Sequence, residues 1–217
     1  MSLAIFDLDN TLLAGDSDYL WGQYLVEQGI VQRDAYEAAN LQFYQDYQSG
    51  RLDIEEFLGF ALRPLAEHEP ARLHAWRSEF VEQKIRPILL PQAQTLIERH
   101  RRQGDLIVVI TATNRFVTEP IVALYGIEHL IATTPEFVGG RYTGRFVGAP
   151  CFRDGKVTRL RAWLEDVDQD LAGSWFYSDS HNDEPLLSLV DNPVAVDPDE
   201  KLLSLARARG WPVISLR

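Results

Sequence analysis

The sequence opens on Leu3-Ala4-Ile5-Phe6-Asp7-Leu8-Asp9-Asn10-Thr11-Leu12-Leu13, in which a short apolar run leads directly into two carboxylates. Such a run predicts a buried strand. Side chains on a strand point to alternate faces, so Asp7 and Asp9, and Thr11 if the extended geometry continues, are expected on one side. Carboxylates this close need a cation between them or a shared proton, which indicates a metal site, an acid/base pair or both. A solvated acidic turn is the alternative.

The composition narrows the class of protein. The 217 residues, 46% of them hydrophobic, suit one domain with an insertion, or one large and one small domain. A formal net charge of -11 disfavours a general affinity for nucleic acid or for anionic membrane surfaces. Cys151 is the only cysteine, which excludes an internal disulfide and fits a reducing, cytoplasmic location. We expect neither a signal peptide nor a membrane span.

The rest of the chain falls into a helical part and an alternating part. Residues 16–86 carry apolar residues at helical spacing, with helices expected at 16–29, 33–48, 53–65 and 70–85. Beyond residue 87, helices and strands alternate, which predicts a doubly wound, mainly parallel α/β sheet. The strands are expected at 105–111, 129–134, 175–179, 194–196 and 213–216. A glycine-rich hairpin is expected at 139–146 and helices at 92–103, 114–125, 156–166, 184–189 and 199–209.

Four further polar residues stand at or near the ends of these elements. Thr111 and Asp179 close predicted strands, Asp183 follows four residues after Asp179, and Lys156 opens a predicted helix. Parallel strands point their carboxyl ends at one edge of a sheet, so these residues are expected to converge there with the two N-terminal carboxylates. Taken singly, each also fits a plainer role as a solvated lysine, a helix cap or a strand former.

In this order, the residues resemble the four motifs of the haloacid dehalogenase-like (HAD) superfamily. Asp7-Leu8-Asp9-Asn10-Thr11 is similar to the first motif, D-x-D-x-T, and Thr111 to the threonine or serine of the second. Lys156 is similar to the lysine of the third motif, and Asp179 with Asp183 to the acidic fourth motif. The resemblance implies a Rossmann-like core, residues 1–15 and 87–217, with residues 16–86 as a helical C1-type cap domain. This arrangement is typical of subfamily IB, the branch of phosphoserine and histidinol phosphatases.

The resemblance also implies a mechanism. Asp7 would attack phosphorus and form an aspartyl-phosphate, and Asp9 would act as general acid and then as general base. Mg²⁺ would be held by Asp7, the backbone carbonyl of Asp9, and Asp179. Thr111 would bind a phosphoryl oxygen and Lys156 would screen the charge between Asp7 and phosphate. Asp183 would support the metal site or the lysine.

Specificity is expected in the cap. Asp16 stands where phosphoserine phosphatases place an acid that binds the substrate amine, although capping the first helix is an equally simple role. Ala112 and Asn182, within the second and fourth motifs, are also expected to contact the substrate. Ala61 stands where an arginine should bind the carboxylate of phosphoserine, and Arg63 is expected on another helix face.

These residues favour an amino alcohol phosphate, and the opening stretch resembles those of bacterial histidinol-phosphate phosphatases. L-histidinol phosphate is therefore the leading substrate, with phosphoserine or another small phosphomonoester as alternatives. A phospho-accepting receiver, a phosphotransferase acting on a sugar or alcohol, and a non-catalytic binding module are rival functions. His181 is expected on an exposed loop, and the aromatic residues of the cap are expected to pack rather than to form a stacking platform. The oligomeric state is left open.

Overall fold

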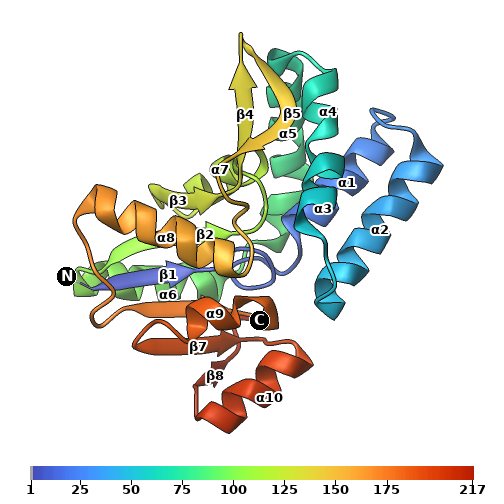
Figure 1. The fold of residues 1–217 in the computed structure, drawn as a ribbon. Helices are drawn as coiled ribbons and strands as arrows, with labels where there is room; N and C mark the ends of the chain where they lie inside the picture. The colour runs from blue at the N-terminus through green and yellow to red at the C-terminus, as the bar shows by residue number, and fades with distance from the viewer. Residues whose placement is uncertain (1) are drawn as a thin grey trace.

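A computed structural model describes residues 2–217, which fold around a parallel sheet. In this part of the chain the sheet has six strands in the order β3-β2-β1-β6-β7-β8 (Figure 1). The strands are β1 (Leu3–Phe6), β2 (Leu106–Thr111), β3 (His129–Ala132), β6 (Trp175–Ser178), β7 (Asn192–Val196) and β8 (Val213–Ile214). A separate antiparallel hairpin consists of β4 (Thr134–Val138) and β5 (Arg141–Val147). The predicted α/β fold class is confirmed.

Helices cover both faces of the sheet. Because alternate strand residues face opposite sides, Ala4 and Phe6 belong to one buried core while Leu3 and Ile5 belong to another. The helices α6 and α7 pack into the first core, and α8, α9 and α10 pack into the second. They comprise α6 (Pro91–Gln103), α7 (Arg115–Leu124), α8 (Asp154–Val167), α9 (Glu184–Leu187) and α10 (Glu200–Arg209). The sheet is therefore doubly wound, as predicted.

The strand order reverses between β1 and β6. From β1 the chain builds outward through β2 to β3, whereas from β6 it builds through β7 to β8 on the other side. Phe6 pairs with Tyr177, so the residues that follow these two strands emerge side by side. Ligands of open α/β sheets bind in the crevice at such a switch point, beyond the carboxyl ends of the strands. The topology thus brings the first and fourth motifs together.

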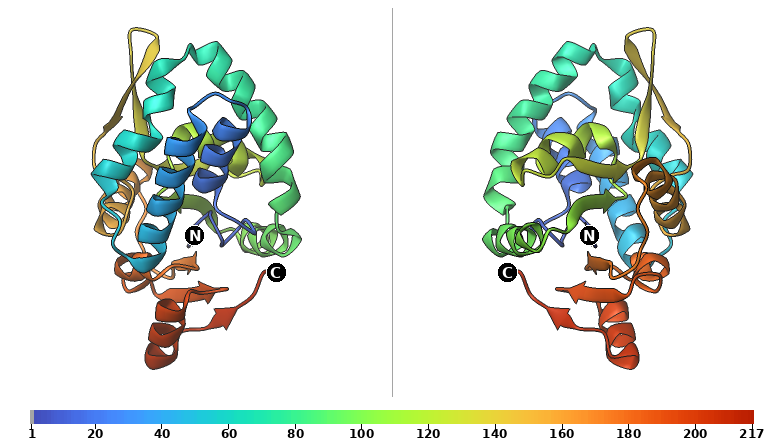
Figure 2. Two further views of the ribbon diagram at one scale, coloured as in Figure 1. Left: turned by 90° about the vertical axis from the view of Figure 1, so that its right-hand side faces the viewer. Right: turned by 90° about the vertical axis from the view of Figure 1, so that its left-hand side faces the viewer.

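The segment between β1 and α6, here called the helical insertion (residues 17–88), has no strand in the structure. It comprises α1 (Ser17–Glu27), α2 (Arg33–Ser49), α3 (Ile54–Ala61), α4 (Arg63–Glu67), α5 (Pro70–Phe80), the π-helix η1 (Val81–Ile85) and the 3₁₀-helix η2 (Arg86–Ile88). Its helices gather on one side of the sheet (Figure 2). The division of the chain into core and cap domains stays a prediction.

Two of the predicted helices are not continuous α-helices. The helix expected at 53–65 is divided at Leu62, and Pro64 lies in the first turn of α4. Proline lacks the backbone donor that an uninterrupted helix needs, so Pro64 marks this break. The helix expected at 70–85 stops being α-helical at Phe80 and continues as the wider turns of η1 and the tighter turn of η2, which contains Pro87.

The two ends of the helical insertion lie side by side. Where the chain leaves and re-enters the sheet region, Ala14 N donates to Ile88 O (2.8 Å), and Leu13 and Leu89 form an antiparallel bridge. The hairpin expected at 139–146 begins earlier than predicted, because β4 is its first strand and residues 139–146 supply only the turn and most of β5. It is more than a surface feature, since β5 lies against α4. Its turn is made by two glycines with positive φ, which glycine adopts without strain.

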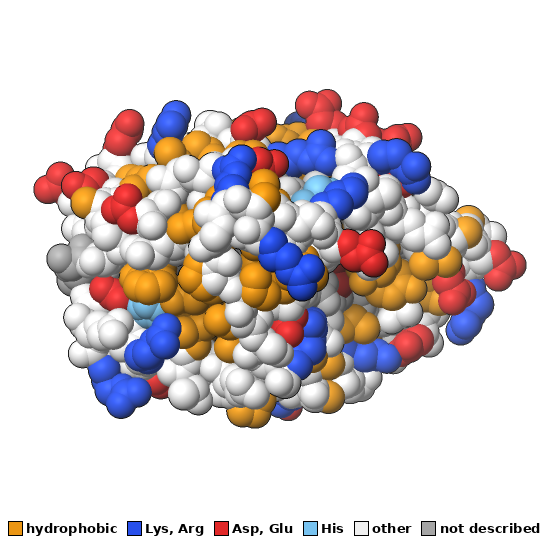
Figure 3. Space-filling model, turned by 90° about the horizontal axis from the view of Figure 1, so that it is seen from below, with side chains coloured by type: hydrophobic (Ala, Val, Ile, Leu, Met, Phe, Trp, Pro, Cys, Tyr) orange, Lys and Arg blue, Asp and Glu red, His pale blue; other side chains and the backbone are white. Residues whose placement is uncertain are grey.

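The surface carries mixed charge. On the face seen from below, acidic and basic side chains are interspersed, and hydrophobic side chains lie between them (Figure 3). Within residues 2–217, no helix combines the length and the apolar character that crossing a membrane requires.

Candidate functional site

A buried lysine lies between two carboxylates at the switch point. Nζ of Lys156, in the first turn of α8, donates to Oδ1 of Asp7 and to Oδ2 of Asp183, both at 2.8 Å. Ser178 Oγ also donates to Asp183 (2.7 Å). The three charged side chains are at most 4% exposed. The predicted convergence of the first, third and fourth motifs is therefore present in the structure.

Burial and charge act in opposite directions on this cluster. Burial lowers the pKa of Lys156, but the carboxylates of Asp183 and Asp7 more than offset this and leave it above its usual range. Burial raises the pKa of Asp7 to about 7, because Lys156 only partly compensates for the lost solvation and for the charges of Asp183 and Asp9. The lysine therefore stays charged, and it is the group that permits a buried carboxylate at this position.

Asp9 is held on both of its oxygens. Oδ1 accepts a hydrogen bond from the backbone N–H of Ser17, the first residue of α1, at 2.6 Å. Oδ2 accepts from the hydroxyls of Thr113 (2.8 Å) and Thr111 (3.5 Å). Burial raises the pKa of Asp9, and the bonds from Ser17 and Thr113 oppose that rise. Thr113 was not among the predicted site residues, and its hydroxyl, two residues after the motif threonine and just beyond the end of β2, was the available signal.

Asp179 lies on the other side of the switch point, with Thr11 as its partner. The hydroxyl of Thr11 donates to Asp179 Oδ1 (3.2 Å) and accepts from the backbone N–H of Asp179 (3.0 Å). The extended geometry proposed for Thr11 was wrong, because the strand ends at Phe6 and Asn10 adopts a positive φ of 56°. The turn instead carries Thr11 to the fourth motif.

The carboxylates of Asp7 and Asp179 fit a hard divalent cation. Burial, followed by the charges of Asp7 and Asp183, raises the pKa of Asp179 well above its usual range, and a bound cation would offset both effects. Within residues 2–217, no three acidic, histidine or cysteine side chains form a complete protein cage for a metal. Mg²⁺ requires no such cage, since it keeps several waters and binds through one or two carboxylates. The donor set therefore suits Mg²⁺ better than a structural zinc ion.

A cavity opens from the switch point into the helical insertion. It encloses about 540 Å³ not filled by protein atoms, including space open to solvent. Four carboxylates line it, those of Asp7, Asp9, Asp16 and Asp18, and so does Ala112. Burial and the neighbouring charge of Asp9 raise the pKa of Asp18 to about 7. Asp16 also accepts from Tyr19 N (2.8 Å), so it caps α1 and faces the cavity at once.

Aromatic rings form the opposite wall of the cavity. Tyr19 and Tyr44 stack with their ring centroids 4.8 Å apart. Phe43, Tyr47 and Phe57 line the same space. Three tyrosines of the insertion thus pack at the border of the cavity, and the expectation that such rings pack rather than form a stacking platform stays a prediction. Helical spacing shows which residues share a face, but it does not show that the face borders a cavity instead of a core.

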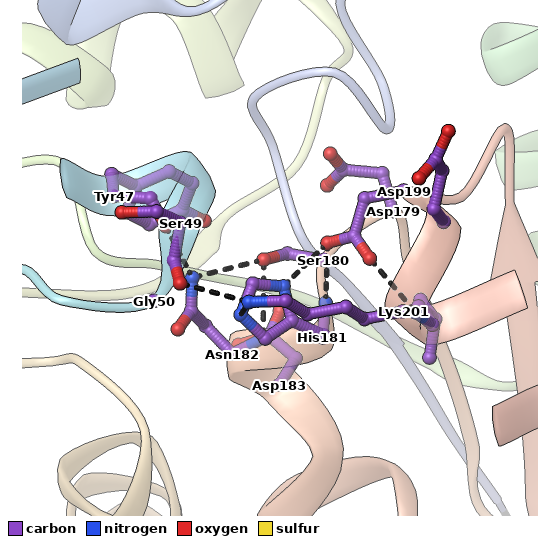
Figure 4. A network of polar contacts seen from close by, with 12 residues as sticks. Tyr47, Ser49, Gly50, Asp179, Ser180, His181, Asn182, Asp183, Asp199 and Lys201 are labelled. Carbon is purple, nitrogen blue, oxygen red and sulfur yellow. Dashed lines mark hydrogen bonds and ion pairs between the residues drawn. The ribbon is translucent and has the colours of Figure 1, made fainter. Parts of the chain in front are cut away.

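Two residues of the fourth motif lie elsewhere than expected. Asn182 was predicted to contact substrate, but it is not among the residues that line the cavity. Its amide is bonded instead to Arg153 (3.1 Å) and to the carbonyl of Tyr47 (3.1 Å). His181 is not an exposed loop residue: its ring is 17% exposed and lies 2.7 Å from Asp199. Asn182 therefore joins the insertion to the sheet region, whereas His181 lies against Asp199 and Lys201 (Figure 4).

Gly155, directly before Lys156, has no room for a side chain. A Cβ placed on it would overlap the backbone carbonyl oxygen of Pro150, which has no flexible atoms to move aside. Gly155→Ala is expected to lower the free energy of unfolding by about 1–3 kcal/mol, measured by urea denaturation. Gly59→Ala is the control, because no atom lies within 4 Å of its Cβ. This helical substitution should raise stability by about 0.5–1 kcal/mol. Equal effects of the two would contradict the steric argument.

Comparison with known proteins shows similarity to hydrolases and phosphatases. Residues 4–188 match the family model of haloacid dehalogenase-like hydrolases. A histidinol-phosphatase of Neisseria meningitidis is 45% identical, over 100% of this chain and 99% of its own length. A protein of unknown function from Bordetella pertussis Tohama I has a crystal structure with a TM-score of 0.94, 45% identity and coverage of 100% and 99%. A phospho-aspartyl intermediate analogue of phosphoserine phosphatase gives a TM-score of 0.72 at 15% identity, covering 100% and 93%, and supports the fold alone.

Proposed function

Because this chain belongs to the haloacid dehalogenase-like hydrolase family and is a phosphomonoester hydrolase, we propose that it acts through an aspartyl-phosphate on Asp7 with Mg²⁺ as cofactor. The support is the position of Asp7 at the switch point, where it is buried, paired with Lys156 and open to the cavity. A carboxylate attacks phosphorus readily once the repulsion between the two anions is screened. Lys156 supplies part of that screening.

Each neighbouring residue has a proposed part in the reaction. Asp9 donates a proton to the leaving oxygen and later withdraws one from water, and its raised pKa favours this exchange. The hydroxyl of Thr111 binds a phosphoryl oxygen, while Asp183 holds Lys156 in place through its 2.8 Å bond. Asp7, Asp179 and the backbone carbonyl of Asp9 would hold Mg²⁺, which supplies Lewis-acid stabilisation of phosphoryl charge.

We propose L-histidinol phosphate as the substrate, on the composition of the cavity wall. Among the described lining residues there is no lysine or arginine, whereas Asp16 and Asp18 lie beyond the two reactive carboxylates. Such a wall favours a substrate with a positive charge and no carboxylate. Arg63, the one candidate for a carboxylate contact, points away and pairs with Glu67 on an exposed surface. The rings of Tyr19 and Tyr44 offer an aromatic face to the flat imidazole ring, while Asp16 and Asp18 suit the ammonium group. The 45% identical histidinol-phosphatase agrees with this choice.

The choice of substrate is tested by a steady-state panel with Mg²⁺. We expect kcat/KM for L-histidinol phosphate to exceed that for phosphoserine by about tenfold or more, since a site without a cation leaves the carboxylate unpaired. Asp18→Asn should lower kcat/KM for histidinol phosphate by about tenfold, the value of one charge-assisted hydrogen bond. The same variant should leave turnover of p-nitrophenyl phosphate nearly unchanged, because that substrate carries no cation. Equal efficiency on phosphoserine would refute the assignment.

The rival functions have distinct outcomes in the same assay. A phosphotransferase would need a sugar or alcohol acceptor, whereas we expect phosphate release with water as the sole acceptor. A receiver or a binding module would show no repeated turnover, and membership of the hydrolase family speaks against both.

The proposed partner of the chain is a small phosphomonoester. The buried free thiol of Cys151 suits the cytoplasmic location that we propose.

A further inference from the structure

The end of α2 is fastened to the sheet region by three side chains. Its last carbonyl groups have no partners within the helix and carry partial negative charge. Three carbonyl groups at this end of the helix accept hydrogen bonds from donors outside the helical insertion, and Figure 4 labels two of the donors, Asn182 and Lys201. The pairs are Asn182 with Tyr47 O (3.1 Å), Lys201 with Ser49 O (2.8 Å) and Arg153 with Gly50 O (2.6 Å). Asn182 lies within the fourth motif, whereas Arg153 and Lys201 lie outside the motif residues.

Arg153 is the centre of this contact. Besides the carbonyl of Gly50, its guanidinium donates through Nε and Nη2 to Oδ1 of Asn182, both at 3.1 Å. Its guanidinium carbon also lies 4.9 Å from the ring centroid of Phe152. The planar guanidinium therefore bonds the insertion and the fourth motif at the same time, which a single ammonium group cannot do in the same geometry.

Arg153 connects two segments that hold the buried Lys156, the start of α8 and the fourth motif. Arg153 is the residue before α8, so Lys156 follows three positions later in its first turn. Asn182 directly precedes Asp183, which accepts from Lys156 Nζ at 2.8 Å. The contact with Gly50 thus fixes the two protein segments on which the position of Lys156 depends.

The backbone of Arg153 is strained. Its φ of 50° and ψ of -122° lie in a region that favours glycine. A residue other than glycine keeps such a conformation only where its surroundings hold it there. Here the side chain makes three hydrogen bonds, and these bonds compensate for the backbone conformation.

We propose that Arg153 is a positioning residue that couples the seating of the helical insertion to the placement of Lys156. When α2 is docked, Gly50 O and Asn182 fix the guanidinium, and the start of α8 is held with Lys156 between Asp7 and Asp183. When α2 is displaced, Arg153 loses its acceptor at Gly50, and Lys156 loses part of its support. The inference rests on the phosphatase activity but not on the identity of the substrate.

Arg153→Gly tests the side chain without adding strain, since glycine accepts this φ. We expect kcat for p-nitrophenyl phosphate with Mg²⁺ to fall between about 10-fold and 100-fold, as displacement of a catalytic group does. KM should change much less. Arg153→Lys keeps one donor and should recover part of the loss. Arg159→Ala is the matched control: this arginine of α8 also donates to two carbonyls, those of Ala149 and Val147, but not to the insertion.

Hydrogen exchange, measured without substrate, separates positioning from general destabilisation. In Arg153→Gly, amide protection should fall in residues 47–53 and at the start of α8, while peptides from β1 and β2 keep theirs. A uniform loss of protection, or an equal loss of kcat in Arg159→Ala, would overturn the proposal. So would unchanged kcat in both Arg153 variants. If the wild type released no phosphate, the proposed function would fail, whereas paired exchange at the two segments would still support the coupling.

Discussion

Asp7→Asn is expected to lower kcat for p-nitrophenyl phosphate, with saturating Mg²⁺, by about 10⁴-fold or more. The substitution keeps the shape of the side chain and its place beside Lys156, but it replaces the attacking carboxylate by an amide that is not a nucleophile. Asp7 is also a proposed ligand of Mg²⁺, so the loss combines both parts of its role. The residue is 3% exposed, and asparagine has nearly the same volume as aspartate. The expected loss of activity would therefore not come from a steric change.

Two measurements make this expectation specific to Asp7. Asp34→Asn removes an exposed carboxylate from α2 and should keep the activity of the wild type. Mass spectrometry of the acid-quenched wild type should find a phosphoryl group on the peptide that contains Asp7, and none in Asp7→Asn. A variant whose kcat stays within tenfold of the wild type would show that another group attacks phosphorus.

Lys156→Met is expected to lower the free energy of unfolding by about 3–5 kcal/mol and to abolish activity. The lysine is 2% exposed and lies 2.8 Å from both Asp7 and Asp183, so its loss leaves two buried carboxylates with no opposite charge. Urea denaturation measures the stability, and the same preparations give the phosphatase rate.

A double variant distinguishes charge from packing at this position. Lys156→Met combined with Asp183→Asn removes a second buried charge, and we expect it to be more stable than Lys156→Met alone. If the cavity left by the lysine were the cause, the second substitution would add to the loss. A loss below about 1 kcal/mol in the single variant would mean that the cluster is far better solvated than its burial indicates.

The convergence of Asp7, Asp179 and Lys156 could be predicted from the sequence, because the carboxyl ends of parallel strands meet at one edge of the sheet. Asp7 and Asp179 follow β1 and β6, which are adjacent at the switch point, so their proximity follows from strand order alone. Lys156 needed only to open the helix that packs over those strands. The local sequence pattern was sufficient to predict a site residue wherever a strand ends or a helix begins at the site.

The remainder depended on side chains that meet across segments distant in sequence. The stacking of Tyr19 on Tyr44 requires the relative placement of α1 and α2, which helical periodicity does not contain. Arg153 gave no signal, because its role comes from a positive φ and from acceptors 103 and 29 residues away. Asn10 likewise turned the chain by a positive φ where continued extension was expected.

The paired connections at Leu13–Leu89 and Ala14–Ile88 have a mechanical consequence for the helical insertion. A domain connected by one flexible segment can rotate in any direction, whereas two connecting segments that are hydrogen-bonded to each other form a hinge that restricts the rotation. This hinge lies a few residues from Asp9. An opening of the insertion about it would break the hydrogen bonds that Arg153 donates to Gly50 O (2.6 Å) and that Arg77 donates to Phe116 O (2.7 Å), so these two arginines hold the insertion against the rest of the chain.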